Sequence, residues 1–188
     1  GGENGPIGLQ FISQPFKENA FESSNETDPL IESHHETAPG VIYKYKGKIN
    51  SDNSIEYYGR ALWAISRYCA TYCRFCFRGR MVGLPAHQSH SNGETLLQKP
   101  YLSAEDIEKV IAFLKDHREI NEVVLSGGDP LIVPQKYFQN ILTKLSILQK
   151  NNNLDIIRIH TRAPITNPES VKDWHLAELK KIQNPYIV

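Results

Sequence analysis

The feature that most constrains the fold of this chain is a regular alternation of short apolar runs with amphipathic helical patterns. Three apolar runs begin near residues 123, 156 and 186, about 30 residues apart, which suits a repeated β/α unit. Another apolar run, Ala61–Ser66, precedes them. Strands that alternate with helices pair in parallel through crossover connections. The sequence therefore predicts an α/β fold that forms part of a (β/α) barrel, with a doubly wound open sheet as the alternative.

Helical patterns occupy the intervals between these predicted strands. The segment Ser103–Asp106 has the composition of a capping box, and the apolar residues after it recur at the spacing of one helical face. Pro134 is well placed to begin a second helix, because its missing N–H is no loss in the first turn. We predict a third helix over 168–182, before a last strand that begins near Tyr186.

The amino-terminal part of the chain does not share this alternation. Residues 1–40 are rich in Gly, Pro, Asn, Ser and Glu, and we expect an irregular arm. Residues 41–46 alternate as in an edge strand or hairpin, and 47–54 are expected to form a polar loop. We therefore predict an amino-terminal arm with an edge hairpin over 1–58, and the first part of a barrel domain over 59–188.

Composition and the chain ends narrow the functional classes. Lysine plus arginine and aspartate plus glutamate number 21 each, so no net positive field recruits nucleic acid. The longest apolar runs are too short to span a bilayer, and the start of the chain does not read as a secretory signal. We expect a cytoplasmic protein with reduced thiols. Because the chain begins with Gly1 and ends like the start of a strand, we also expect it to be a fragment of a longer chain.

The three cysteines of the chain, Cys69, Cys73 and Cys76, fall within eight residues in the spacing C-x3-C-x2-C. Thiolates this close can converge on one metal centre, and soft sulfur ligands select iron–sulfur clusters, zinc or Cu(I). A four-iron cluster held by three thiolates leaves one iron open to a cofactor or substrate. A closed structural zinc site would need a fourth protein ligand.

A zinc site is the alternative to a cluster at these cysteines. His87, His90 or His160 would complete a Cys3His set, which would make the chain a non-catalytic zinc-binding module. Four arginines flank the cysteines: Arg67, Arg74, Arg78 and Arg80. Because guanidinium groups offset the negative charge of a cluster, these flanks favour iron and sulfide over zinc.

Two further polar segments follow predicted strands, as the cysteines do. They are Ser126–Pro130 and His160–Pro164, and the carboxyl ends of the strands are where β/α barrels carry their active sites. Gly127 and Gly128 would let the backbone approach a ligand closely, and Asp129 offers a carboxylate suited to an ammonium group. The three segments together therefore predict one site.

Taken singly, the same residues also fit structural roles. Gly-Gly-Asp-Pro is common in an ordinary strand-to-helix turn, and His160 fits a hydrogen-bonded core histidine. Arg158 would be a costly charge inside a barrel unless it is paired. Arg162 lies in the loop after the strand, where it could meet an anion.

The cysteine motif matches the radical S-adenosylmethionine signature, and the wider pattern resembles the lysine 2,3-aminomutase branch of that superfamily. The segments that carry this resemblance are Ile7–Phe11, Asp28–Leu30, Ala38–Gly40, Leu125–Leu131 and Ile157–Pro164. Cys76-Phe77-Arg78 is similar to the members that prepare lysine for modification of elongation factor P.

The resemblance implies a set of cofactors and a site residue for each. Cys69, Cys73 and Cys76 would ligate a 4Fe–4S cluster whose open iron binds S-adenosylmethionine (SAM). The candidate cofactor-binding residues around it are Ser126, Gly127, Gly128, Asp129, His160 and Arg162. Arg60 and Arg78 match arginines that face pyridoxal phosphate and the anionic groups of the substrate.

The resemblance also implies an activity and partners. Reductive cleavage of SAM would give a 5′-deoxyadenosyl radical, which abstracts hydrogen from lysine or a related amino acid held on pyridoxal phosphate, so that the amino group migrates. A flavodoxin- or ferredoxin-type reductant, and the elongation factor P pathway, are the expected partners. The family's pyridoxal-binding lysine would lie beyond Val188, so we expect this chain alone to be inactive. A radical SAM enzyme without pyridoxal phosphate is a further alternative.

Overall fold

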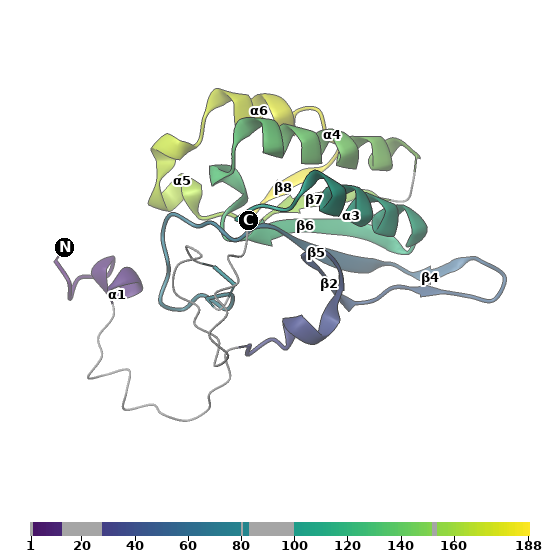
Figure 1. Cartoon of the computed structure of the whole chain (residues 1–188), viewed down its shortest axis with the longest axis horizontal. Helices are drawn as coiled ribbons and strands as arrows, with labels where there is room; N and C mark the ends of the chain where they lie inside the picture. The colour runs from purple at the N-terminus through teal and green to yellow at the C-terminus, as the bar shows by residue number, and fades with distance from the viewer. Residues whose placement is uncertain (1, 13–27, 80, 83–99, 152–153) are drawn as a thin grey trace.

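The computed structural model of the chain describes residues 2–12, 28–79, 81–82, 100–151 and 154–188 (Figure 1). Its largest element is a six-stranded sheet with the strand order β1-β2-β5-β6-β7-β8. The first two strands of this order are antiparallel to their neighbours, and β5 to β8 run parallel. The bounds are Glu36–Ala38 (β1), Val41–Tyr45 (β2), Gly59–Ser66 (β5), Ile120–Gly127 (β6), Ile156–Ile159 (β7) and Pro185–Ile187 (β8).

Helices lie over one face of the parallel part of this sheet (Figure 1). The three longest in the described residues are α3 (Ala104–Asp116), α4 (Gln135–Asn151) and α6 (Asp173–Leu179). A doubly wound sheet carries helices on both faces, whereas the strands of a β/α barrel carry them only on the outer face. The structure confirms the predicted α/β class and matches part of a barrel.

The core lies between the sheet and these helices. Trp63, Leu125 and Ile157 on three adjacent parallel strands are fully buried, as are Phe138 and Leu145 of α4. Successive side chains of a strand point to opposite faces, so the residues between them face the other side of the sheet. That second face is the inner face of a barrel, and it carries charged residues described below.

Local signals set where the long helices begin. The side chain of Ser103 accepts a hydrogen bond from the Asp106 amide at 3.1 Å, and the Asp106 carboxylate accepts one from the Ser103 amide at 3.3 Å. The predicted capping box is therefore present at the start of α3. As predicted, α4 begins directly after Pro134. Within the described residues, we find no helix that is both long and apolar enough to cross a membrane.

The helix predicted over 168–182 is interrupted. Within that range the chain forms the 3-10 turn η5 (Pro168–Ser170) and then α6, and a further short helix, α5 (Ala163–Thr166), precedes it. The break falls at Val171 and Lys172, whose backbones are extended, with φ −79° and ψ 113° at Val171 and φ −111° and ψ 159° at Lys172. The apolar pattern did not reveal this break, because Val171 within it and Trp174 after it both pack against the core.

The amino-terminal part is more regular than predicted. It contains a helical turn, α1 (Gly8–Phe11), and a 3-10 turn, η2 (Glu32–His35), and β2 lies between β1 and β5 instead of at the sheet edge. The loop expected over 47–54 belongs to a separate hairpin, β3 (Lys48–Ile49) and β4 (Ile55–Tyr57), which projects from the sheet in Figure 1. The inner position of β2 comes from its pairing with β5, which local composition does not encode.

Candidate functional site

The loops that follow β5, β6 and β7 meet at the carboxyl ends of these strands and line one cavity of about 510 Å³. The three cysteines, Ser126–Asp129 and His160–Arg162 all lie on its wall, as does Arg78. Arg60 lines a neighbouring pocket of about 180 Å³, which it shares with Arg78 and His160. The structure thus brings together the segments that the sequence placed at separate strand ends.

The cysteines occupy a loop of tight turns. The amide of Cys76 donates to the carbonyl of Cys73, and the amide of Gly79 donates to the carbonyl of Cys76, each at 3.1 Å. The Thr71 hydroxyl lies between two of the sulfurs, 3.5 Å from Cys69 Sγ and 3.7 Å from Cys73 Sγ. All three thiols are unpaired. The loop therefore presents three sulfurs to the cavity without a disulfide.

The glycine segment after β6 packs directly against the backbone that leads into the cysteine loop. The Gly128 amide donates to the Ser66 carbonyl at 2.7 Å, and the Asp129 amide donates to the Tyr68 carbonyl at 3.0 Å. A Cβ on Gly127 would collide with the Ser66 carbonyl, and one on Gly128 with the Tyr68 carbonyl. Gly127 also has φ +112°, which L side chains rarely adopt. The close approach that these glycines permit is between two loops of the protein.

The carboxylate of Asp129 joins the second loop to the third. Oδ1 accepts from the Leu131 amide at 3.0 Å and the Thr161 hydroxyl at 2.7 Å, and Oδ2 accepts from the amides of Arg162 at 2.9 Å and Ala163 at 3.1 Å. Asp129 is only 4% exposed. We expected this carboxylate to face an ammonium group, but these four donors already occupy its acceptor positions. It instead fixes the loops relative to each other.

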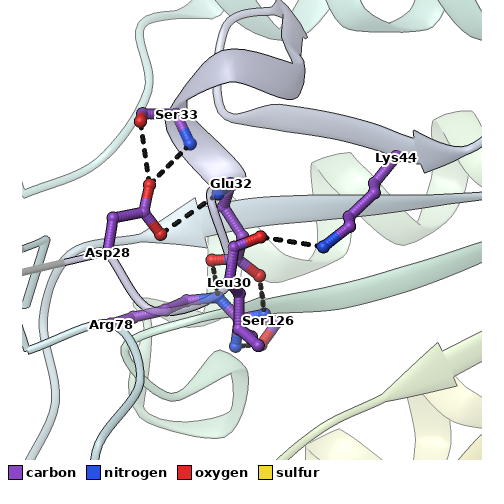
Figure 2. A network of polar contacts seen from close by, with 7 residues as sticks. All are labelled: Asp28, Leu30, Glu32, Ser33, Lys44, Arg78 and Ser126. Atoms are coloured by element: carbon purple, nitrogen blue, oxygen red, sulfur yellow. Dashed lines mark hydrogen bonds and ion pairs between the residues drawn. The ribbon is translucent and has the colours of Figure 1, made fainter. Parts of the chain in front are cut away.

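Arg78 is held by an acid from the amino-terminal arm, as Figure 2 shows. Its Nε donates to Glu32 Oε2 at 3.0 Å and its Nη2 to Glu32 Oε1 at 2.6 Å, while Nη1 lies 3.3 Å from Ser126 Oγ. The Glu32 side chain is 6% exposed. Arg78 was expected to face a ligand anion, and it does line the cavity, but two of its three donor nitrogens are committed to Glu32.

Glu32 escaped the sequence analysis, and the residues around it explain its position. The Asp28 carboxylate accepts from the amides of Glu32 at 3.0 Å and Ser33 at 2.9 Å, and from the Ser33 hydroxyl at 2.8 Å (Figure 2). Lys44 Nζ of β2 donates to the Leu30 carbonyl at 2.9 Å. Aspartate side chains often accept hydrogen bonds from backbone amides a few residues later in the chain, so Asp28 was a sequence signal that this segment is ordered. Nothing local indicated that Glu32 would be buried.

A second acid pairs with two arginines on the inner face of the sheet. Glu122 of β6 accepts from Arg60 Nε at 2.8 Å and from Arg158 Nε at 2.6 Å, and the Arg158 guanidinium lies 5.3 Å from the ring centre of Tyr186. Burial raises the pKa of Glu122, but the hydrogen bonds from Arg158 and Arg60 outweigh it and hold the pKa below its usual value. Arg158 is thus paired. The sequence feature that indicated this pairing was the presence of opposite charges, Glu122 and Arg158, in two adjacent predicted strands.

His160 lies where the two cavities adjoin and lines both. Among the described residues its ring has no hydrogen-bond partner, so it is not the hydrogen-bonded core histidine that we held as an alternative. Its pKa is lowered by burial first and then by the positive charges of Arg78 and Arg158. A neutral imidazole therefore faces the cavity near neutral pH.

The buried, hydrogen-bonded histidine of this region is His175, which the sequence analysis did not single out. It is 1% exposed; its Nδ1 accepts from the Lys172 amide at 2.9 Å, and its Nε2 lies 2.8 Å from the Leu131 carbonyl. Because Nδ1 is an acceptor, Nε2 carries the proton and donates to Leu131. His175 thereby connects α6 to the turn that follows the Gly-Gly-Asp segment.

The residues present fit a cluster with an open coordination site. Three unpaired thiols line one cavity, and the Arg162 guanidinium lies 2.6 Å from Cys73 Sγ, where its positive charge would offset the negative charge of a cluster. In the parts of the chain that the structure describes, no three His, Cys, Asp or Glu side chains are gathered as ligands of a single ion. His87, His90 and Arg80 lie outside the described residues.

Comparison with known proteins identifies the scaffold. Residues 63–185, which include the cysteine loop and the loops after β6 and β7, match the model of the radical SAM superfamily. This match covers more than half of the chain.

The chain is also similar to curated L-lysine 2,3-aminomutases, as the sequence motifs predicted. It is 30% identical to that of Methanococcus maripaludis over 176 residues, covering 94% of this chain and 34% of the relative. It is 27% identical to that of Bacillus subtilis over 186 residues (96% and 32%) and 28% identical to that of Clostridium subterminale over 178 residues (95% and 36%). The chain spans about a third of the length of these relatives. With the C-x3-C-x2-C loop at the end of the first parallel strand and a family match over 63–185, the chain belongs to the radical SAM superfamily.

Proposed function

We propose that this chain is the cluster- and SAM-binding part of an enzyme of the lysine 2,3-aminomutase type. The observation that carries the proposal is the single cavity of about 510 Å³ whose wall combines three unpaired cysteines with the glycine segment and the third loop. When bound, the cluster would supply the electron that cleaves SAM to a 5′-deoxyadenosyl radical.

The chain's own residues have distinct tasks in this proposal. Cys69, Cys73 and Cys76 would hold a 4Fe–4S cluster on three of its irons. The backbone of Ser126–Asp129 and the His160 side chain face the same cavity and would bind SAM. Arg162 lies on the same wall with its Nη1 at Cys73 and its Nη2 at Gln10, so it would act on SAM through its charge. Asp129 acts through the loops, because its carboxylate holds the second and third loops together.

Arg60 and Arg78 would meet the phosphate of pyridoxal phosphate and the carboxylate of the substrate. Both line the pocket of about 180 Å³ on the inner face of the sheet. Four cationic side chains lie in this region with two acids: Arg60, Arg78, Arg158 and Lys44 against Glu122 and Glu32. The excess of two positive charges favours an anionic ligand.

We further propose that the complete reaction is an amino-group migration on lysine or a related amino acid. The similarity to L-lysine 2,3-aminomutases supports this substrate class and the use of pyridoxal phosphate. Cys76-Phe77-Arg78 favours the branch connected with elongation factor P. The proposal includes a flavodoxin- or ferredoxin-type reductant, a cytoplasmic location, and a division into an arm over 1–58 and a barrel part over 59–188.

Anaerobic reconstitution tests the central part of this proposal. The protein should take up about four irons per chain with sulfide, turn brown, and form 5′-deoxyadenosine from SAM when dithionite is added. Cys69→Ala, Cys73→Ala and Cys76→Ala should each lose both properties while keeping the circular dichroism of the iron-free protein. Stoichiometric zinc in a colourless protein would instead support the Cys3His module. In the protein as it occurs in the cell, formation of β-lysine only with pyridoxal phosphate separates the proposal from a radical SAM enzyme that lacks this cofactor.

A further inference from the structure

The side chain of Arg162 is held on several sides at once. Its Nη1 lies 2.6 Å from Cys73 Sγ, and its Nη2 donates to Gln10 Oε1 at 2.8 Å. The guanidinium lies 5.1 Å from the ring centre of Phe75 and 5.6 Å from that of Phe11. Two of the groups that hold it, Gln10 and Phe11, come from the amino-terminal segment, about 150 residues away in the chain.

The amino-terminal segment is itself fastened to the cysteine loop. Arg74, the residue after Cys73, donates its amide to the Gln10 carbonyl at 3.0 Å and its Nη1 to the Leu9 carbonyl at 2.7 Å. Gln10 Nε2 also donates to the Pro6 carbonyl at 3.2 Å. The segment therefore lies against the cysteine loop that it helps to organise. Because Gln10 Nε2 is held by the Pro6 carbonyl, Gln10 Oε1 is oriented to accept from Arg162.

The chemistry of an iron–sulfur cluster gives this arrangement a consequence. The reduced cluster carries one more negative charge than the oxidised one. Hydrogen bonds and positive charge at a ligand sulfur favour the reduced form, so they raise the reduction potential. The rings of Phe11 and Phe75 lie at cation–π distance from the guanidinium and help to hold it beside the sulfur.

We propose that Arg162 sets the reduction potential of the cluster by donating to the Cys73 sulfur, and that Gln10 is a positioning residue that holds Arg162 there. This inference rests on the proposed function, because it needs a cluster on the three cysteines. It gives the segment Gly8–Phe11 a task in electron transfer to the cluster that neither the superfamily match nor the aminomutase similarity assigns.

A redox titration of the reconstituted protein, followed by the electron paramagnetic resonance of the reduced cluster, tests the inference. Arg162→Gln should make the cluster about tenfold harder to reduce, which for a one-electron couple is about 59 mV. Gln10→Ala should shift the potential in the same direction by a smaller amount. Arg162→Lys keeps the positive charge, but a single ammonium group cannot contact Cys73 and Gln10 together as the planar guanidinium does. The reduction potential of the cluster in this variant should therefore lie between those of the wild type and Arg162→Gln.

Arg67→Gln is the matched control. Arg67 precedes Cys69 by two residues, but its side chain lines a different pocket, of about 170 Å³. This variant removes the same charge near the cluster without removing a contact to sulfur, so its shift should be less than half of that in Arg162→Gln.

The outcomes separate the inference from the proposed function. Equal shifts in Arg162→Gln and Arg67→Gln, with the cluster assembled in both, would overturn the inference and leave the cluster proposal intact. If Arg162→Gln does not assemble a cluster, Gln10→Ala decides, and an unchanged potential in that variant overturns the inference. A wild-type protein that takes up no iron would refute the proposed function itself.

Discussion

Glu32 and Arg78 form a two-point ion pair across 46 residues of sequence, with contacts of 2.6 and 3.0 Å. The two side chains are 6% and 16% exposed, so the pair is largely removed from water. It joins the amino-terminal arm to the last turn of the cysteine loop, directly beside Ser126. Glu32 and Leu30 of the arm thereby form part of the wall of the neighbouring pocket of about 180 Å³.

Removal of the acid from this pair should destabilise the protein strongly. Glu32→Ala leaves the Arg78 guanidinium buried without its partner, which typically costs about 3 kcal/mol or more. Urea denaturation of the iron-free protein measures the free energy of unfolding. Glu56→Ala is the matched control, because it breaks the exposed pair between Lys48 and Glu56, whose side chains are 55% and 43% exposed. That change should cost less than about 1 kcal/mol, and similar losses in the two variants would contradict the importance of burial.

A methyl group at Gly128 should disturb the cysteine loop. The added Cβ would meet the Tyr68 carbonyl oxygen, and backbone cannot move aside as a flexible side chain can. We expect Gly128→Ala to cost about 1–3 kcal/mol and to lower iron uptake. Gly79→Ala is the control within the same loop, since among the described residues its Cβ would meet only the Cys76 carbonyl, at an ordinary 3.5 Å. Normal iron uptake and stability in Gly128→Ala would show that the two loops do not depend on this approach.

Asp129→Asn should loosen the loops without changing the size of the side chain. The asparagine side chain would have an NH2 group in place of one carboxylate oxygen. That group would face at least one of the four N–H and O–H donors that now donate to the carboxylate. The loss of buried hydrogen bonds to a charged group should cost about 2 kcal/mol or more. The readouts are the denaturation midpoint and faster amide exchange at Arg162 and Ala163. Unchanged exchange at both amides would argue against this role.

The stability of the fold should fall as the solution becomes acidic, partly through His175. Burial lowers the pKa of His175, so the folded protein resists taking up a proton there that the unfolded chain accepts near pH 6.5. Its contribution is fully present above that pH and is lost as the pH falls toward the lowered pKa. His160 acts in the same direction.

A comparison of unfolding free energies at pH 7.5 and pH 5.5 checks this prediction. His175→Gln should reduce the difference between the two pH values, because the variant has no group at this position to protonate. His34→Gln, at an exposed position of the arm, should leave the difference unchanged. An identical pH dependence in the wild type and His175→Gln would contradict the prediction.

The sequence predicts the parts of this fold that repeat locally. The strands, the long helices and the capping box at Ser103 follow from periodicity and from short-range hydrogen bonds. The cysteine loop and the segments after β6 and β7 could be assigned to one site, because parallel strands place their carboxyl ends together.

The remaining features depend on contacts between distant parts of the chain. The burial of Glu32 requires the arm to lie beside Arg78, and the role of Asp129 requires the loop after β7 to lie against the turn after β6. The break at Val171 and Lys172 was concealed, because Val171 and Trp174 both pack against the core as residues of one helical stripe would. Pairing partners of single charged residues leave no trace in local periodicity.

The hydrogen bonds from Gly128 and Asp129 to the backbone before Cys69, and from the loop after β7 to the Asp129 carboxylate, also have an entropic consequence. Flexible loops lose conformational entropy when a ligand orders them, and that loss weakens binding. Here the three loops are already fixed to one another by the fold. Ligand association at this cavity therefore requires little further ordering of the backbone, and more of the energy of each contact remains available as affinity.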